Sequence, residues 1–159
     1  MSKDIFIVDR KYMSILEHAG ISVGEVLKRA GLPEDLFSHK SPSINTLEYM
    51  KFLEAIRETN DDKELPLKIS TVDNLETFSP PVFAAYCSKN GLMCMKRLSQ
   101  YKKLIGSFIF NVIENKDSVS LEMTFEKSEY ELPEYLLASE LVFTLQLIRN
   151  ATKKRIIPK

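Results

Sequence analysis

The sequence is poor in the residues that build metal and redox sites. Among 159 residues it has two cysteines, two histidines and no tryptophan. Cys87 and Cys94 have a spacing that fits no zinc or redox motif, and two thiols cannot complete a four-ligand zinc site. We therefore expect no metal site, and we expect both cysteines to be buried free thiols.

Motifs that carry catalysis are also missing. Neither His18 nor His39 forms a recognisable motif with a cysteine or serine. There is no Gly-x-Ser-x-Gly sequence and no glycine-rich loop that would cradle a phosphate. The carboxylates are numerous, but none stands out as a pair. These absences predict that the chain is not an enzyme and uses no cofactor.

Long apolar runs are absent as well. No run approaches the ~20 residues that a membrane-spanning helix needs. The N-terminal MSKDIFIVDRKY has charges on both sides of a four-residue apolar run, which is not the pattern of a signal peptide. Five glycines and seven prolines argue against a fibrous or low-complexity chain. We expect a single cytoplasmic domain over residues 1–159 with no membrane association.

Charge is balanced overall but segregated along the chain. Basic and acidic residues number 22 each, which gives little support for a DNA-binding face. Five basic residues and no acid lie between Thr77 and Ile113, whereas eight acids and two lysines lie between Glu114 and Glu140. Two interpretations are open. The two segments face water or each other, or part of the basic group faces an anionic ligand.

Helical spacing of apolar residues dominates up to Gly106. Ser22 with Glu25, and Asn45 with Glu48, form the pattern of a capping box at the start of a helix. Ser79 precedes Pro80 as an N-cap precedes a first helical residue. The expected helices span 10–18, 22–31, 45–60, 65–72 (the weakest), 79–88 and 90–105.

The period then changes to two. Residues 107–113 and 118–126 alternate as strands around a Glu-Asn-Lys-Asp turn, which predicts an antiparallel hairpin. The first strand is apolar on both faces, so we expect it to be central or covered on both sides. The second has one apolar face and one polar face. The fold class is therefore α+β, mostly helical, with the hairpin packed against helices.

A long helix at 133–153 completes the expected fold. Its apolar stripe is too broad for a two-stranded sheet to cover alone. Either the helix is fully central, or it forms a dimer interface or a surface covered by chain that this sequence does not contain.

The order of these segments is similar to that of one known family. Ala-Gly-Ile at 19–21 precedes a short helix, and Ala-Gly-Leu at 30–32 precedes one further turn. A loop then leads to the helix over 44–58, and an apolar-then-small stretch follows at 78–86. Met95-Lys96-Arg97-Leu98, with Tyr101, stands where the family has an "ALR…L…Y" pattern. The chain resembles the N-terminal effector domain of AraC-type transcriptional regulators.

This resemblance implies an effector-sensing and dimerisation domain that binds a small molecule. It implies DNA contact only through a C-terminal helix-turn-helix domain absent here, and a domain truncated at its C-terminal end. The chain departs from the family pattern in lacking glycines near 67–70 and before 80–88. Residues 23–37 have the order of a helix-turn-helix, but their second piece, Glu34-Asp35-Leu36-Phe37, is too short and acidic to read DNA.

Pocket-forming residues are densest between positions 83 and 110. Effector pockets combine apolar walls with a few orienting polar groups. The alternative for each of these residues is plain core packing. The competing function is a ligand-free dimerisation or protein-interaction module that uses helix 133–153. The candidate effector-binding residues are Phe83, Tyr86, Arg97, Tyr101, Phe108 and Phe110.

Overall fold

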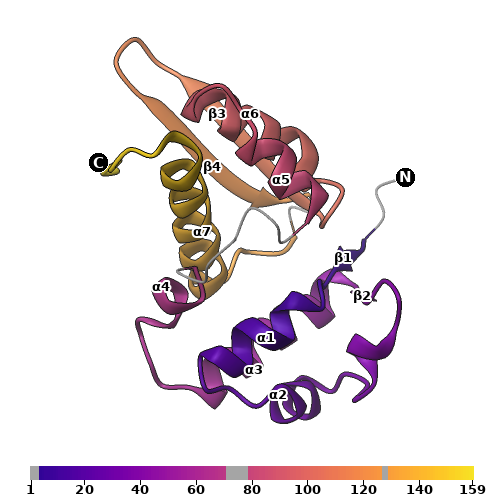
Figure 1. Ribbon diagram of the computed structural model, residues 1–159. Helices are drawn as coiled ribbons and strands as arrows, with labels where there is room; N and C mark the ends of the chain where they lie inside the picture. Colours follow the sequence, from indigo (N-terminus) through magenta and orange to yellow (C-terminus); the bar gives the residue numbers. More distant parts are fainter. Residues whose placement is uncertain (1–3, 71–78, 127–128) are drawn as a thin grey trace.

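The computed structural model describes residues 4–70, 79–126 and 129–159. Within these ranges the chain forms seven α-helices, one 3-10 turn and two two-stranded antiparallel sheets (Figure 1). This confirms the expected α+β class with a high helical content. The sequence divides at residues 71–78 into an N-terminal helical half and a C-terminal half that contains the hairpin.

The N-terminal half is a small helical layer joined by a short sheet. Strand β1 pairs with β2, so Phe6 lies opposite Ile44. The backbone of β1 also reaches the C-terminal half, because Ile7 N donates to Ile105 O at 2.7 Å. The elements are β1 (Phe6–Ile7), α1 (Lys11–His18), α2 (Val23–Ala30), the 3-10 turn η1 (Leu36–Ser38), β2 (Ser43–Ile44), α3 (Thr46–Thr59) and α4 (Leu65–Ser70).

The caps explain where two of these helices begin. At α3 the capping box is complete: Asn45 Oδ1 accepts from Glu48 N at 2.9 Å, and Asn45 N donates to the Glu48 carboxylate at 2.8 Å. At α2 Ser22 Oγ accepts from Glu25 N at 3.4 Å, while the Glu25 carboxylate pairs with Arg29. The expected box at Ser22 therefore forms its N-cap half. The weak candidate at 65–72 is a helix as far as Ser70, and its last two residues lie outside the described ranges.

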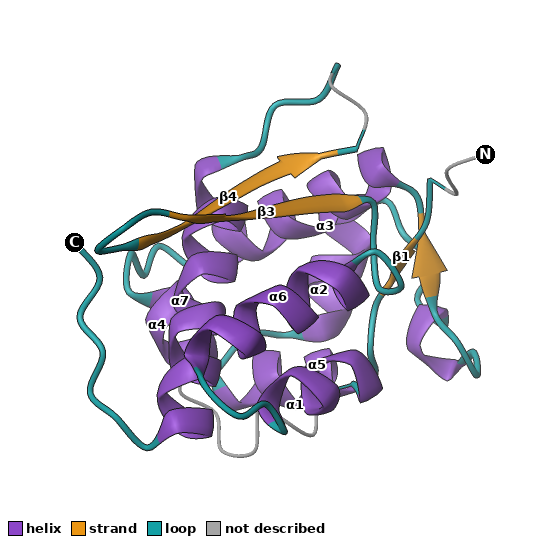
Figure 2. Cartoon of the chain, turned by 90° about the horizontal axis from the view of Figure 1, so that it is seen from above, coloured by secondary structure: helices purple, strands orange, loops and turns teal. Residues whose placement is uncertain are grey.

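The C-terminal half packs α6 against the hairpin and against α7 (Figures 1 and 2). The predicted strands and final helix are confirmed, with boundaries that shift by one residue. The expected helix 90–105 ends earlier, at Lys102. The elements are α5 (Pro80–Tyr86), α6 (Gly91–Lys102), β3 (Phe108–Glu114), β4 (Val119–Phe125) and α7 (Glu134–Thr152).

The hairpin buries only part of one face. Phe108 pairs with Phe125 and Phe110 with Met123, and all four side chains are buried. Towards the turn, Ile113 is 40% exposed, and the hairpin extends beyond the helices (Figure 1). The expectation that the first strand is central or covered on both sides is wrong. Among the described residues β3 pairs with β4 alone, and Asn111 and Ile113 on its other face are exposed.

Gly106 follows α6 at a point where the Phe6 ring of β1 approaches the backbone closely. A Cβ at this position would overlap the Phe6 ring, with Cε1 of Phe6 only 2.6 Å away. Any larger residue would push β1 away from the end of α6, because packed interiors leave no room for an added methyl group. This glycine therefore lets β1 pack between the two halves.

The two cysteines are free, but they differ in environment. Cys94 is buried on α6, and burial raises the pKa of its thiol to about 11. Cys87 caps α5 and is exposed. The expectation of burial is thus right for Cys94 and wrong for Cys87, which lies at a helix end beyond the packed face.

Two hydrophobic clusters hold the structure together. The main cluster joins the N-terminal helices to the hairpin and includes Phe6, Phe52, Phe108, Phe125 and Leu136. The small cluster joins α5, α6 and the end of α7, and consists of Val82, Ala85, Cys94, Leu98, Leu147 and Ile148. Helix α7 contributes to both clusters and therefore links the two packing units.

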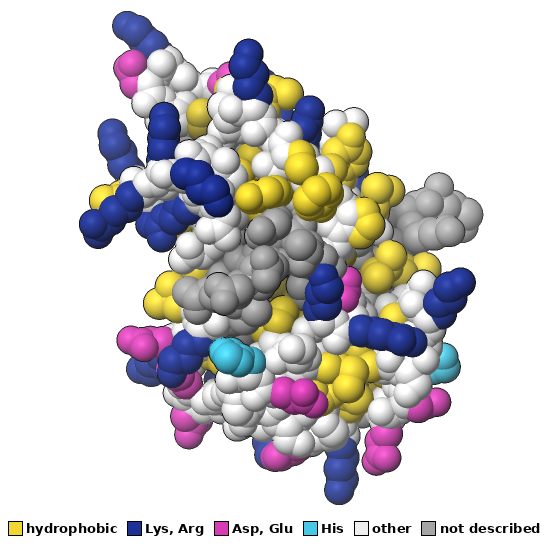
Figure 3. Space-filling view, in the orientation of Figure 1, with side chains coloured by type: hydrophobic (Ala, Val, Ile, Leu, Met, Phe, Trp, Pro, Cys, Tyr) yellow, Lys and Arg dark blue, Asp and Glu magenta, His cyan; other side chains and the backbone are white. Residues whose placement is uncertain are grey.

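Helix α7 is not covered on all sides. Leu136, Glu140 and Thr144 lie on its buried stripe, whereas Leu141 is 39% exposed and most of its other apolar residues are half-buried. The sequence left open whether this helix is fully central, and the structure shows that it is not. On the face in Figure 3, lysine and arginine side chains lie over both halves and are most crowded near the C-terminus, whereas most acidic side chains lie over the N-terminal helices.

Candidate functional site

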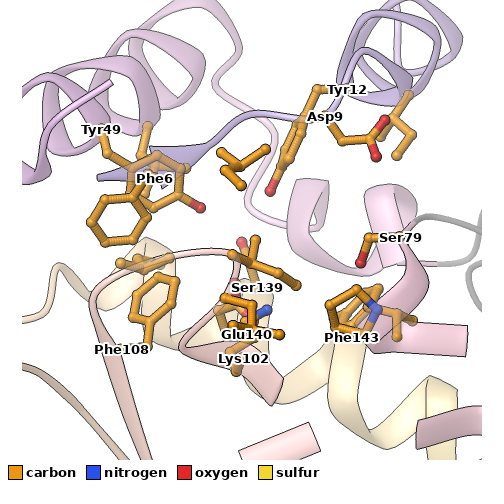
Figure 4. Close-up of a pocket in the computed structure, with 18 of the residues that line it drawn as sticks. Phe6, Asp9, Tyr12, Tyr49, Ser79, Lys102, Phe108, Ser139, Glu140 and Phe143 are labelled. Carbon is orange, nitrogen blue, oxygen red and sulfur yellow. The ribbon is translucent and has the colours of Figure 1, made fainter. Parts of the chain in front are cut away.

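A cavity of about 230 Å³ lies between the two halves of the molecule (Figure 4). Its walls come from β1, α1 and α3 on one side and from α6, the start of β3 and α7 on the other, with the start of α5 at one end. An apolar cavity of ~150 Å³ can hold benzene. This cavity is therefore large enough for a single ring with a short substituent.

Helical spacing places three sets of side chains on the cavity. Tyr12 and Ile15 are three residues apart on α1, and Tyr49, Leu53 and Ile56 follow one face of α3. On α7 the residues are Leu136, Ser139, Glu140 and Phe143. The periodicity that predicts each helix also brings these residues to a common face.

The floor of the cavity contains a buried ion pair. Lys102 Nζ donates to Glu140 Oε2 at 2.6 Å, and the two side chains are 7% and 9% exposed. The ammonium also lies 5.7 Å, 5.6 Å and 5.3 Å from the ring centroids of Phe108, Phe110 and Phe143. Carboxylate and ring faces together offset the cost of burying this charge.

This pair answers the question about the segregated charges. Lys102 belongs to the basic segment and Glu140 to the acidic one. A second, exposed pair joins Lys96 to Glu114 in the same way. The two segments thus face each other at these points, as in the first of the two interpretations.

Three tyrosines in the cavity wall are neutral groups. Tyr12 and Tyr49 hydrogen-bond to each other through their side chains, and burial, followed by nearby negative charge, raises both pKa values. Burial also raises the pKa of Tyr135 to about 12. In Figure 4 the Tyr12 ring extends from α1 towards Ser139 and Glu140 on α7. These hydroxyls keep their protons at neutral pH.

Two hydroxyls in the wall are buried without a hydrogen-bond partner among the described residues, Tyr135 Oη and Ser79 Oγ. Ser79 is the N-cap residue of α5, as expected, but its side chain does not cap the helix. The Ser139 hydroxyl donates to the backbone oxygen of Tyr135 at 2.8 Å. Since buried polar groups are usually paired, a bound molecule would have two groups to satisfy.

The six candidate residues that were predicted from the sequence do not lie together in the structure. Phe108 lines the cavity, and Phe110 lies behind it against Lys102. Tyr101 is half-buried on α6 and lies outside the wall.

The other three candidates lie around α5. Phe83 is 50% exposed and stacks near Tyr86 with ring centroids 6.4 Å apart. Arg97 joins α6 to α5 by donating to the backbone oxygens of Ala84 and Cys87. None of the three lines the cavity. Their contact with an effector stays a prediction.

Sequence reasoning missed Tyr12, Tyr49 and Glu140. One signal could have pointed to Glu140, because it lies on the apolar stripe of α7, one turn after Leu136. A carboxylate in such a stripe needs a buried partner. The tyrosines gave no such signal, since their spacing is that of ordinary core residues.

Other site types find no support in the described part of the chain. Within residues 4–70, 79–126 and 129–159 no group of three or more His, Cys, Asp or Glu residues could hold a metal ion. In the same ranges no helix has the length and apolar character to cross a membrane.

Comparison with known families identifies the chain. A comparison with curated proteins found no match. The family described as the arabinose-binding domain of AraC transcription regulator, N-terminal, matches residues 20–159. The match begins after β1 and α1, so the cavity residues Phe6, Asp9, Tyr12 and Ile15 precede it. Because the match covers most of its length, this chain belongs to the family of N-terminal arabinose-binding domains of AraC transcription regulators.

Proposed function

We propose that this domain is the sensor of a cytoplasmic AraC-type regulator and binds a small-molecule effector in the cavity between its two halves. The family supports a ligand-sensing regulatory role and is not a known enzyme family. The observation that carries the proposal is the cavity itself, with mostly apolar walls, a buried ion pair and two hydroxyls that have no hydrogen-bond partner in the described part of the chain. This is the usual make-up of a small-molecule site.

The two-sided wall gives the effector a way to act. A molecule in the cavity contacts β1, α1 and α3 on one side and α6 and α7 on the other. It therefore favours the arrangement in which the two halves are closed on each other. We propose that this shift changes how a helix-turn-helix domain of the regulator engages DNA.

A stability screen tests effector binding. A ligand at 100 times its dissociation constant adds about 2.7 kcal/mol to the free energy of unfolding, which a domain of this size shows as several degrees in Tm. Ser139→Leu fills the cavity from α7 and should abolish the shift. Ser120→Leu makes the same change at an exposed site on β4 and should keep it. A shift that survives Ser139→Leu would place the ligand elsewhere.

The regulatory step needs its own measurement. In the regulator that carries this domain, bound effector should change the affinity for duplex DNA. Bound DNA should change effector affinity by the same factor, because coupling is reciprocal. Equal DNA affinity with and without effector would refute the regulatory step and leave effector binding intact.

One observation favours a second function, dimerisation through helix 133–153. Leu137, Leu141 and Leu145 recur every four residues on α7 and are all partly exposed. We propose that this stripe packs against a second copy of the chain, which could occur with or without an effector. Leu141→Glu should shift sedimentation equilibrium towards monomer, whereas Leu47→Glu, at an exposed site on α3 outside the cavity, should not.

A further inference from the structure

The charged groups in the cavity wall disfavour the binding of an ionic ligand. Among the described residues of its wall, Asp9, Lys102 and Glu140 are charged, and together they carry one net negative charge. The positive charge of Lys102 is already held by Glu140 at 2.6 Å and by three ring faces. Asp9 is half-buried and accepts from Lys11 N at 2.9 Å.

An anionic ligand would have to separate or share the ion pair. To reach Lys102, a ligand carboxylate must either displace Glu140 or lie beside it on the same ammonium. Displacement would leave the Glu140 carboxylate buried without its partner. Breaking a buried pair in this way is strongly unfavourable. The two wall carboxylates would also repel the incoming charge across a medium of low dielectric.

A cationic ligand meets the opposite difficulty. The faces of Phe108 and Phe143 that could hold an ammonium are already next to Lys102. A ligand ammonium would therefore lie beside another ammonium and share Glu140 with it. The negative charge of the wall does not remove this local repulsion.

A ligand rich in hydroxyls also fits poorly. Much of the wall is formed by apolar side chains such as Phe6, Ile15, Leu53 and Ile105, which offer no hydrogen bonds. Each buried hydroxyl without a partner is unfavourable. In the described part of the wall, the hydroxyls without a hydrogen-bond partner are those of Tyr135 and Ser79.

We propose that the effector is an uncharged, mostly apolar molecule, about the size of one substituted ring, with a single hydroxyl or carbonyl group. This inference rests on the proposed function of the cavity. The apolar body contacts the aromatic and aliphatic walls, and the polar group bonds to Tyr135 Oη or Ser79 Oγ. The Lys102–Glu140 pair stays intact and excludes ionic analogues of the same shape.

Matched probes test the charge preference directly. Calorimetry and thermal shift compare phenethyl alcohol, phenylacetate and phenethylamine, then hexanol, hexanoate and hexylamine, with L-arabinose as the polyhydroxylated probe. The alcohols should bind at least about tenfold more tightly than their ionic analogues and the sugar. A carboxylate, amine or sugar that binds as well as the alcohols would overturn the inference.

Two variants show whether the wall charges cause the preference. Glu140→Gln removes the negative partner of Lys102 and should raise phenylacetate affinity about tenfold or more, towards that of the alcohol. Asp9→Asn leaves the pair intact and should raise it less, which provides a test even if Glu140→Gln does not fold. Unchanged phenylacetate affinity in a folded Glu140→Gln variant, or in Asp9→Asn if Glu140→Gln does not fold, would overturn the inference.

The cavity-filling variant separates this inference from the proposed function. If alcohols and carboxylates bind equally and Ser139→Leu abolishes both, the cavity is a ligand site but its selectivity is not that proposed. If no probe binds, or if the alcohols bind Ser139→Leu unchanged, the proposed function fails and this inference fails with it.

Discussion

The two hydrophobic clusters fill space in different ways. In the main cluster rings pack against rings: Phe6 stacks on Tyr49 with centroids 4.3 Å apart, and Phe108 on Phe125 at 5.7 Å. The small cluster instead brings helices close through small side chains. At Gly91 an added Cβ would lie 3.1 Å from Ile148 Cγ2. The cavity lies where these two kinds of packing meet and neither fills the space.

The largest loss of stability is expected from a substitution that removes one of the stacked rings in the main cluster. Phe6 is 1% exposed, so Phe6→Ala should lower the free energy of unfolding by about 3–5 kcal/mol. Phe83→Ala makes the same change at a 50% exposed ring beside the small cluster and should cost less than about 1 kcal/mol. Urea denaturation measures both. Similar losses would show that burial does not distinguish the two regions.

The next effect concerns the ion pair between the clusters. Glu140→Leu leaves Lys102 buried and unpaired, and should destabilise the domain by about 3 kcal/mol. Glu114→Leu removes the exposed partner of Lys96 and should cost less than about 1 kcal/mol. The double variant Lys102→Met with Glu140→Leu should recover most of the loss. Failure to recover would mean that the pair is needed for more than charge balance.

A smaller effect appears at alkaline pH. The folded domain keeps the Tyr135 proton to a pKa of about 12, whereas the unfolded chain loses it near the ordinary value of 10.0. Stability from this group is therefore complete below pH 10, falls by about 1.4 kcal/mol per pH unit between pH 10 and the folded pKa of about 12, and changes no further above that. Tyr135→Phe should make the loss between pH 10 and 12 less steep. An unchanged slope would contradict the desolvated hydroxyl described above.

The smallest losses of stability are expected when one helix N-cap is removed from each half of the molecule. Asn45→Ala removes a reciprocal capping box from α3 and should cost about 1–2 kcal/mol. Asn90→Ala removes a single cap bond from α6 and should cost about 1 kcal/mol or less. Thermal denaturation of both variants provides the comparison. A larger loss at Asn90 would mean that the small cluster depends more on local structure than the main one.

The sequence alone determined the local structure. Asn45 and Asn90 accept from backbone amides three residues away, and the alternation of residues 118–126 predicts the second strand of the hairpin. These features depend on interactions between residues that are close in sequence, so they can be predicted from the sequence. The order of such segments also suffices for the family resemblance that the match to residues 20–159 confirms.

Only the tertiary structure decided which side chains meet in the cavity wall. Lys102 and Glu140 are 38 residues apart in sequence, and β1 pairs with β2 so that Phe6 lies opposite Ile44. Spacing places Tyr12 and Tyr49 on the apolar faces of their helices, but it does not show that the two faces meet. Which buried groups become neighbours depends on how the helices pack, because packing joins residues whose separation in the chain carries no periodic signal.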